Sequence, residues 1–166
     1  MERSLKRKLR KGVFSNVSPE RSRIMSSIKG KHNKSTELRL RLALVKSGLK
    51  GWVLHPSDVF GKPDIFFTKK KLAIFVDGCF WHGCATCGHI PKTRSAFWKA
   101  KFERNQARAL LVKGNLRKQS IKVMRVWEHV LTKPSKIAEL VKAISKNEPL
   151  GKNGAIYERY SSKVKR

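Results

Sequence analysis

The 166-residue sequence predicts an α/β fold in which a mixed sheet is flanked by helices. Three observations predict this class: leucines at helical spacing, short apolar runs bounded by glycine and proline, and a long basic helical pattern between two such runs. The expected order is helix, three strands, helix, strand and helix. A hydrophobic content of 40% is enough for a core. We therefore expect one domain over residues 18–146, a flexible basic arm over 1–17 and a basic tail over 147–166.

The helices are predicted from start signals and apolar spacing. Ser18 and Pro19 begin a short helix that runs to about Ile28. An amphipathic helix over about 35–47 follows, because apolar residues recur at spacings of four, three and four: Leu38, Leu42, Val45 and Leu49. A long helix from Ser95 to about Arg117 and a final helix around 137–144 complete the set.

The strands are predicted at 52–55, 65–67, 72–76 and 121–127. The run 72–76 is apolar on both faces, as is typical of a central strand. Residues 78–92 are rich in glycine, cysteine and histidine without a period, which predicts an irregular loop.

The charge of the chain indicates a polyanionic partner. Lysine and arginine number 39 against 11 acidic residues, a net charge of +28, and residues 35–144 alone keep +15. Nucleic acid is the expected polyanion, since no amphipathic helix with an aromatic apolar face favours acidic lipid. No apolar run approaches the ~18 residues of a membrane span. Three cysteines, an odd number, favour a reducing compartment over a secreted disulfide scaffold.

Acidic residues are scarce, so their positions are informative. The only aspartates are Asp58, Asp64 and Asp77. Asp58 is expected to be a turn residue beside Pro56. Asp64 opens one predicted strand and Asp77 closes the next, so their carboxylates are expected to meet and to hold a divalent cation against DNA. Metal-dependent nucleases carry such a pair followed by lysine.

At the position of that lysine the chain has Cys79, and His82 is a candidate for the missing base. The alternative interpretation of His82 is a zinc ligand. Zinc is expected because Cys79, Cys84 and Cys87 lie close together in the loop. His129, at the end of the last strand, is our choice of fourth ligand, and His89 is the local alternative. Three buried inert thiols remain the structural alternative.

Several motifs together resemble the very short patch repair endonucleases, bacterial enzymes that nick DNA at T·G mismatches left by deamination of 5-methylcytosine. The resemblance covers about residues 18–145. Its most specific part is the stretch 75–84, FVDGCFWHGC, and it also includes runs at 21–25, 61–64, 91–93, 97–98, 104–105 and 125–129 together with Glu37.

The resemblance implies a restriction-endonuclease-like fold and a Mg²⁺-dependent hydrolysis of one phosphodiester. Asp64 would bind Mg²⁺ with the backbone carbonyl of Val76. His82 would act in general acid–base catalysis, Asp77 occupies a second active-site position, and Glu37 would hold the metal-bound water. An ordinary first-turn carboxylate is the alternative for Glu37.

The resemblance also implies a structural Zn²⁺ and a DNA wedge. The zinc ligands would be Cys79, Cys84, Cys87 and His129. The aromatic residues expected to intercalate beside the mismatch are Phe80, Trp81 and Trp98, for which a core position is the alternative. The resemblance further implies that the protein is a monomer, that it acts on double-stranded DNA, and that it is located in the cytoplasm at the bacterial nucleoid.

Two departures from the family pattern stand out. Arg108 and Ala109 are found where the family usually has an Arg-Asp pair, so one carboxylate is missing, and Ser120-Ile121 replaces a Gly-Trp pair. Two rival functions therefore stay open: another DNA endonuclease of this fold, associated with a restriction system, and a zinc-stabilised DNA-binding protein with impaired catalysis.

Overall fold

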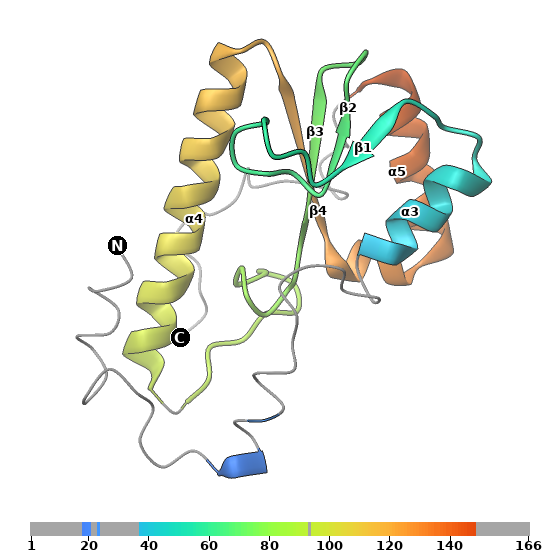
Figure 1. Cartoon of the computed structure of the whole chain (residues 1–166). Helices are drawn as coiled ribbons and strands as arrows, with labels where there is room; N and C mark the ends of the chain where they lie inside the picture. The colour runs from blue at the N-terminus through green and yellow to red at the C-terminus, as the bar shows by residue number, and fades with distance from the viewer. Residues whose placement is uncertain (1–17, 21–22, 24–36, 93, 149–166) are drawn as a thin grey trace.

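The computed structural model describes residues 18–20, 23, 37–92 and 94–148. Within these ranges the regular elements are α3 (Glu37–Lys46), β1 (Trp52–Leu54), β2 (Ile65–Phe67), β3 (Leu72–Asp77), α4 (Ser95–Lys118), β4 (Lys122–Trp127), the 3₁₀ helix η2 (Glu128–Thr132) and α5 (Pro134–Lys146) (Figure 1). This order confirms the predicted succession of elements. The arm 1–17, most of the helix predicted at 18–28 and residues 149–166 of the tail lie outside the described residues. No described helix is long and apolar enough to cross a membrane.

The four strands form one mixed sheet in the order β1-β2-β3-β4. The first three strands pair antiparallel, whereas β3 and β4 run parallel because α4 connects them across one face. Asp77 at the end of β3 is paired with Trp127 at the end of β4. The residues that follow these two strands therefore emerge at the same edge of the sheet.

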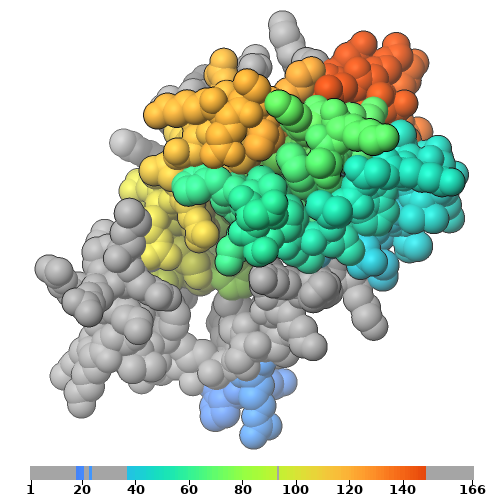
Figure 2. Space-filling model, turned by 45° about the horizontal axis from the view of Figure 1, so that its top comes forward, coloured from blue at the N-terminus to red at the C-terminus, as the bar shows by residue number. Residues whose placement is uncertain are grey.

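Helices cover both faces of the sheet, with α4 on one face and α3 and α5 on the other (Figure 1). Figure 2 shows α3 and α5 side by side at one end of the body, where they contact each other. Alternate residues of β3 enter the two cores, Leu72 and Ile74 toward α3 and α5, Ala73 and Phe75 toward α4. The prediction of a central strand buried on both faces is confirmed.

The apolar face predicted for the first long helix is wrong. Leu38, Leu42 and Val45 are 37%, 50% and 64% exposed, whereas Leu40 and Leu44 are fully buried in the core. The helix carries two neighbouring apolar stripes, one with Leu38 and Leu42 and one with Leu40 and Leu44. The sheet and α5 cover the stripe of Leu40 and Leu44, and the other stripe is exposed.

A turn between β1 and β2 fixes the approach of the chain to the sheet edge. Gly61 has a φ of 82°, and a Cβ at this position would lie 2.5 Å from Cγ1 of Val112 on α4. A glycine is required here both for the backbone conformation and for the close contact. The next residues, Pro63 and Asp64, are thereby held against the sheet where β2 begins.

Candidate active site and metal centre

The sheet register places Asp64 at the centre of the edge formed by β1, β2 and β3. Leu54 is paired with Ile65, and one step further the amide of His55 donates to the carbonyl of Asp64 at 3.2 Å. The Asp64 side chain accepts a hydrogen bond at Oδ2 from the amide of Val76, 2.7 Å away. The contact between these residues is thus made by the Val76 amide, and the expected Val76 carbonyl ligand stays a prediction.

Three side chains from separate segments converge at this edge. Glu37 lies in the first turn of α3, His55 follows β1, and Asp64 precedes β2. Their ligand atoms all lie within 4.8 Å of one another, a spacing that one metal ion can span. Nε2 of His55 lies 3.0 Å from Oε2 of Glu37, and its Nδ1 lies 3.9 Å from Oδ1 of Asp64. We call this trio the acid–imidazole group.

The electrostatics of this group favour a cation. The pKa of Asp64 is raised to about 6, mainly by burial; the carboxylates of Glu37 and Asp77 contribute to the rise, whereas the Val76 amide and His55 oppose it. Without a cation, the Asp64 carboxylate shares one poorly solvated space with that of Glu37, which disfavours charge on Asp64. A divalent ion would reverse this balance because it attracts both ionised groups.

Asp77 belongs to a neighbouring set of contacts. Its side chain is almost fully buried, and Arg125 of β4 donates two hydrogen bonds to it, Nε to Oδ2 at 2.7 Å and Nη2 to Oδ1 at 2.5 Å. His82 lies beside this pair, with Nε2 3.6 Å from Oδ1 of Asp77. Asp77 therefore lies between the acid–imidazole group and His82. In the described part of the chain, Asp77 is not a member of the acid–imidazole group itself.

His82 is suited to proton transfer near neutral pH. Burial lowers the pKa of its imidazole, and Arg125 lowers it further, although the charge of Asp77 opposes both effects. A neutral imidazole can accept a proton, which an imidazolium cannot.

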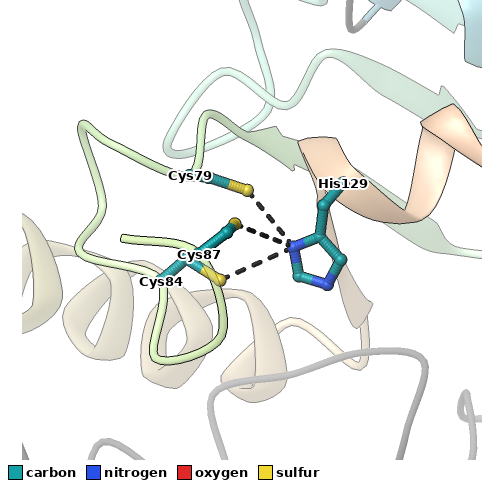
Figure 3. A group of neighbouring side chains, drawn as sticks. All are labelled: Cys79, Cys84, Cys87 and His129. Atoms are coloured by element: carbon teal, nitrogen blue, oxygen red, sulfur yellow. Dashed lines mark hydrogen bonds between the residues drawn. The ribbon is translucent and has the colours of Figure 1, made fainter. Parts of the chain in front are cut away.

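A second group of side chains that could hold a metal ion lies at the same edge, on the other side of Asp77. Cys79, Cys84, Cys87 and His129 bring their ligand atoms within 4.8 Å of one another. The three sulfur atoms lie 3.3–3.5 Å from Nδ1 of His129 (Figure 3). Three thiols and one imidazole form the donor set of a closed tetrahedral zinc site. His89, the alternative fourth ligand, is exposed and lies outside this group.

Backbone contacts shape the loop that supplies the thiols. The amide of Cys84 donates to the carbonyl of Cys79 at 2.8 Å, and the amide of Cys79 lies 3.3 Å from Oε2 of Glu128, next to His129. A Cβ at Gly88 would lie 2.4 Å from the Cys84 carbonyl oxygen, so only glycine fits there. The parallel pairing of Asp77 with Trp127 explains why the loop meets His129. Cys79 lies two residues after Asp77, and His129 lies two residues after Trp127, so the two emerge side by side.

The three aromatic residues predicted to wedge into DNA lie together. The ring centroids of Phe80 and Trp98 are 4.9 Å apart, and those of Trp81 and Trp98 are 6.1 Å apart. All three rings are half-buried, and Lys101 places its Nζ 4.7 Å from the Trp81 centroid. The carbonyl of Trp81 accepts a hydrogen bond from Asn105 of α4 at 2.8 Å. The cluster joins the thiol-bearing loop to the first turns of α4.

Sequence reasoning missed His55. The sequence contains one signal for it: a histidine at the end of one predicted strand and an aspartate just before the next become neighbours if the two strands pair as an antiparallel hairpin. The sequence alone did not give the register of that hairpin.

Comparisons with known proteins agree with this geometry. Residues 15–87 match the family model described as DNA mismatch endonuclease Vsr. The chain is 44% identical over 97 residues to the type II nicking enzyme V.NaeI of Lentzea aerocolonigenes, over 56% of this chain and 58% of that protein. It is 38% identical over 114 residues to V.XorIIP of Xanthomonas oryzae, over 68% and 82%. With the DNA mismatch endonuclease Vsr of Escherichia coli the identity is 30% over 110 residues, 64% and 69% of the two chains.

A mixed α/β fold with a metal-ligand group at one sheet edge, in a strongly basic chain with these relatives, defines a DNA endonuclease. The chain belongs to the DNA mismatch endonuclease Vsr family.

Proposed function

We propose that this protein nicks one strand of double-stranded DNA at T·G mismatches, by divalent-cation-dependent hydrolysis of a phosphodiester. The observation that carries the proposal is the acid–imidazole group at the sheet edge of a Vsr family member. The names of the relatives, mismatch endonuclease and nicking enzymes, support both the substrate and the single-strand cut. The mixed sheet between helices is consistent with a restriction-endonuclease-like fold.

The residues of the acid–imidazole group fit a catalytic cation, which we expect to be Mg²⁺. Asp64 would be its central ligand, with the Val76 carbonyl beside it and Glu37 holding a bound water. When bound, the cation supplies Lewis acidity that activates water and offsets charge on the phosphate. The Val76 amide orients the Asp64 carboxylate for this role, because it fixes Oδ2 at 2.7 Å.

His82 is proposed to move protons in the reaction. Its lowered pKa keeps the imidazole neutral and able to take a proton from the attacking water. Asp77 would then stabilise the imidazolium from 3.6 Å, while Arg125 holds the Asp77 carboxylate in place. Asp77 is therefore proposed as a positioning residue for His82.

The thiol–imidazole quartet is proposed to bind a structural Zn²⁺. All four protein ligands are present, so no position is left open for substrate. Zinc would order a loop with few apolar residues and would keep His82, which lies inside that loop, at a fixed position beside Asp77.

The aromatic cluster is proposed to detect the mismatch. Phe80, Trp81 and Trp98 would insert between base pairs, where unstacking costs a few kcal/mol and less beside a faulty pair. Lys101 beside the rings, and the arm 1–17, would contact phosphates without reading sequence. No second chain is required for any of these roles, which favours a monomer.

The test is a nicking assay with the full-length protein on four otherwise identical duplexes carrying T·G, T·A, C·G and A·C at one position. We expect single-strand cleavage of the T·G duplex in the presence of Mg²⁺, at least about 100-fold faster than of the matched duplexes. Equal cleavage of all four would favour the rival interpretation, a nuclease of this fold that acts on other DNA. Absence of cleavage from all four would favour the DNA-binding protein.

A further inference from the structure

We propose that a hollow at the far end of the sheet binds an unpaired nucleotide of single-stranded DNA. The hollow has a volume of about 380 Å³ and lies where β4 begins, between the ends of α4 and α5. A volume of this order is typical of sites for small organic groups. The inference goes beyond the proposed function and does not rest on it, because none of the residues proposed for cleavage lines the hollow.

The hollow is separate from the candidate active site. Leu72 and Lys122, which line it, are paired at the start of β3 and β4, whereas Asp77 and Trp127 are paired at the other end of the same two strands. Five strand steps of about 3.3 Å each span about 17 Å. Figure 1 shows the end of α4 and the start of β4 at the far end of the sheet from the loop that follows β3. A ligand in the hollow would therefore not contact the acid–imidazole group.

The walls of the hollow carry cations. Lys113 and Arg117 lie one turn apart on α4, and Lys122 begins β4. Lys122 donates a hydrogen bond from Nζ to the carbonyl of Asn147 at 3.2 Å, which holds its ammonium group beside the hollow. Glu148 is the one carboxylate among the described residues that line the hollow. Three cations against one carboxylate favour an anion, and phosphate accepts hydrogen bonds from both lysine and arginine.

The remaining lining suits a nucleobase. Leu72, Ile121 and Met124 supply apolar surface at the starts of β3 and β4. Asn147, just after α5, also lines the hollow, and its Oδ1 is shielded from solvent without a hydrogen bond from any described residue. A buried acceptor that lacks a donor is unfavourable, so a ligand that brings a donor is favoured.

An unpaired base offers both an apolar ring and a free donor. In a duplex the bases are stacked inside and their Watson–Crick edges are paired, so the base itself does not enter a hollow of a protein surface. An unpaired base can pack against apolar side chains and the plane of an arginine while its Watson–Crick edge forms a hydrogen bond. Its flanking phosphates would be bound by Lys113, Arg117 and Lys122.

The test uses the full-length protein and a single-stranded oligothymidylate that carries one 4-thiothymidine, a photocrosslinking base. We expect cross-links in peptides that contain the residues around the hollow, 113–124 and 147–148. Arg117→Ala should lower the cross-link yield and the affinity about fivefold, and should reduce the slope of log Kd against log salt by about 0.7, the value for one phosphate of a single strand. Lys118→Ala is the matched control: it removes the same charge from an exposed neighbour that does not line the hollow, and it should change the yield by less than about twofold.

A matched duplex should bind the two variants with affinities within about twofold of each other. Cross-links outside the hollow only, at the aromatic cluster or in residues 1–17, would overturn the proposal and would favour residues 149–166, which follow Glu148 at the hollow, as its occupant. Equal losses in the two variants, a loss of duplex affinity as large as that for the oligonucleotide, or binding of free thymidine monophosphate as tight as that of the strand would each overturn it too. Thermal unfolding confirms that each variant is folded. None of these measurements uses cleavage, so their failure is distinct from a failure to nick T·G duplexes.

Discussion

Two groups of side chains that could each hold a metal ion lie at one edge of the same sheet and differ in almost every property. The thiol–imidazole quartet offers four candidate ligands, from the loop after β3 and from η2. The acid–imidazole group has three, supplied by α3 and by the residues that flank the turn between β1 and β2. Soft thiolates in a complete tetrahedral set suit a structural ion. Three harder ligands leave positions for water and phosphate.

The contrast shows how one small sheet separates stability from chemistry. Asp77, Arg125 and His82 connect the two groups: Asp77 raises the pKa of Asp64 on one side and contacts His82 of the thiol-bearing loop on the other. If this division is correct, disrupting the quartet should destabilise the fold, whereas neutralising Asp64 should stabilise the cation-free protein and abolish cleavage.

The largest effect on stability is expected from the quartet. Cys84→Ala should lose the zinc and lower the free energy of unfolding by more than about 4 kcal/mol, because loss of a structural metal removes its whole binding free energy from folding. Zinc content by mass spectrometry and thermal unfolding check this. His89→Ala, in the same loop but outside the quartet, should keep the zinc and change stability by less than about 0.5 kcal/mol. Normal stability of a zinc-free Cys84→Ala would contradict the structural role.

A smaller loss of stability is expected from breaking the ion pair between Arg125 and Asp77, which lies between the two groups. Arg125→Met keeps the length of the side chain over the Phe75 ring but leaves Asp77 buried without its charged partner. Stability should fall by about 3 kcal/mol, the usual cost of breaking a buried ion pair on one side. Urea unfolding measures it, with Arg108→Met on the exposed face of α4 as the control. A loss equal to that of the control would mean that the ion pair does not hold this edge.

A gain in stability is expected at the acid–imidazole group. Because burial raises the pKa of Asp64 from 3.8 to about 6, the native state holds an extra proton between these values, so stability decreases as pH rises through that window. Asp64→Asn can still accept the Val76 hydrogen bond but carries no charge. It should stabilise the cation-free, zinc-loaded protein by about 3 kcal/mol at pH 8 and by less than about 1 kcal/mol at pH 4.

Thermal unfolding across pH tests this gain, with the exposed Asp58→Asn as control. A pH-independent difference between Asp64→Asn and the unmodified protein would show that the carboxylate is not destabilised by burial.

The sequence predicted the strands and the quartet for physical reasons that operate locally. The run 72–76 is apolar at every position, which only a strand covered on both faces requires. Three cysteines within nine residues define a soft donor set by themselves, and the expectation that sheet pairing brings a strand end beside the preceding loop was sufficient to select His129. The element order is correct for the same reason, since glycine and proline delimit each run.

The features that the sequence did not provide depend on tertiary geometry. Leu38 and Leu42 lie on the exposed stripe of α3 because the positions of β2 and α5, rather than the spacing, select Leu40 and Leu44. His55 became visible only with the hairpin register that places it opposite Asp64. The contacts of Asp77 with Arg125 likewise depend on the parallel pairing of β3 with β4.

In this protein the chemistry is expected to depend on the acid–imidazole group, while the quartet maintains the fold. The most direct test is Asp64→Ala, measured for zinc content, for binding to a T·G duplex and for nicking of that duplex. We expect full zinc occupancy, mismatch binding within about threefold of the unmodified protein and nicking reduced at least about 1,000-fold, because the central ligand of the cation is lost. Nicking at an undiminished rate by the zinc-loaded variant would contradict it.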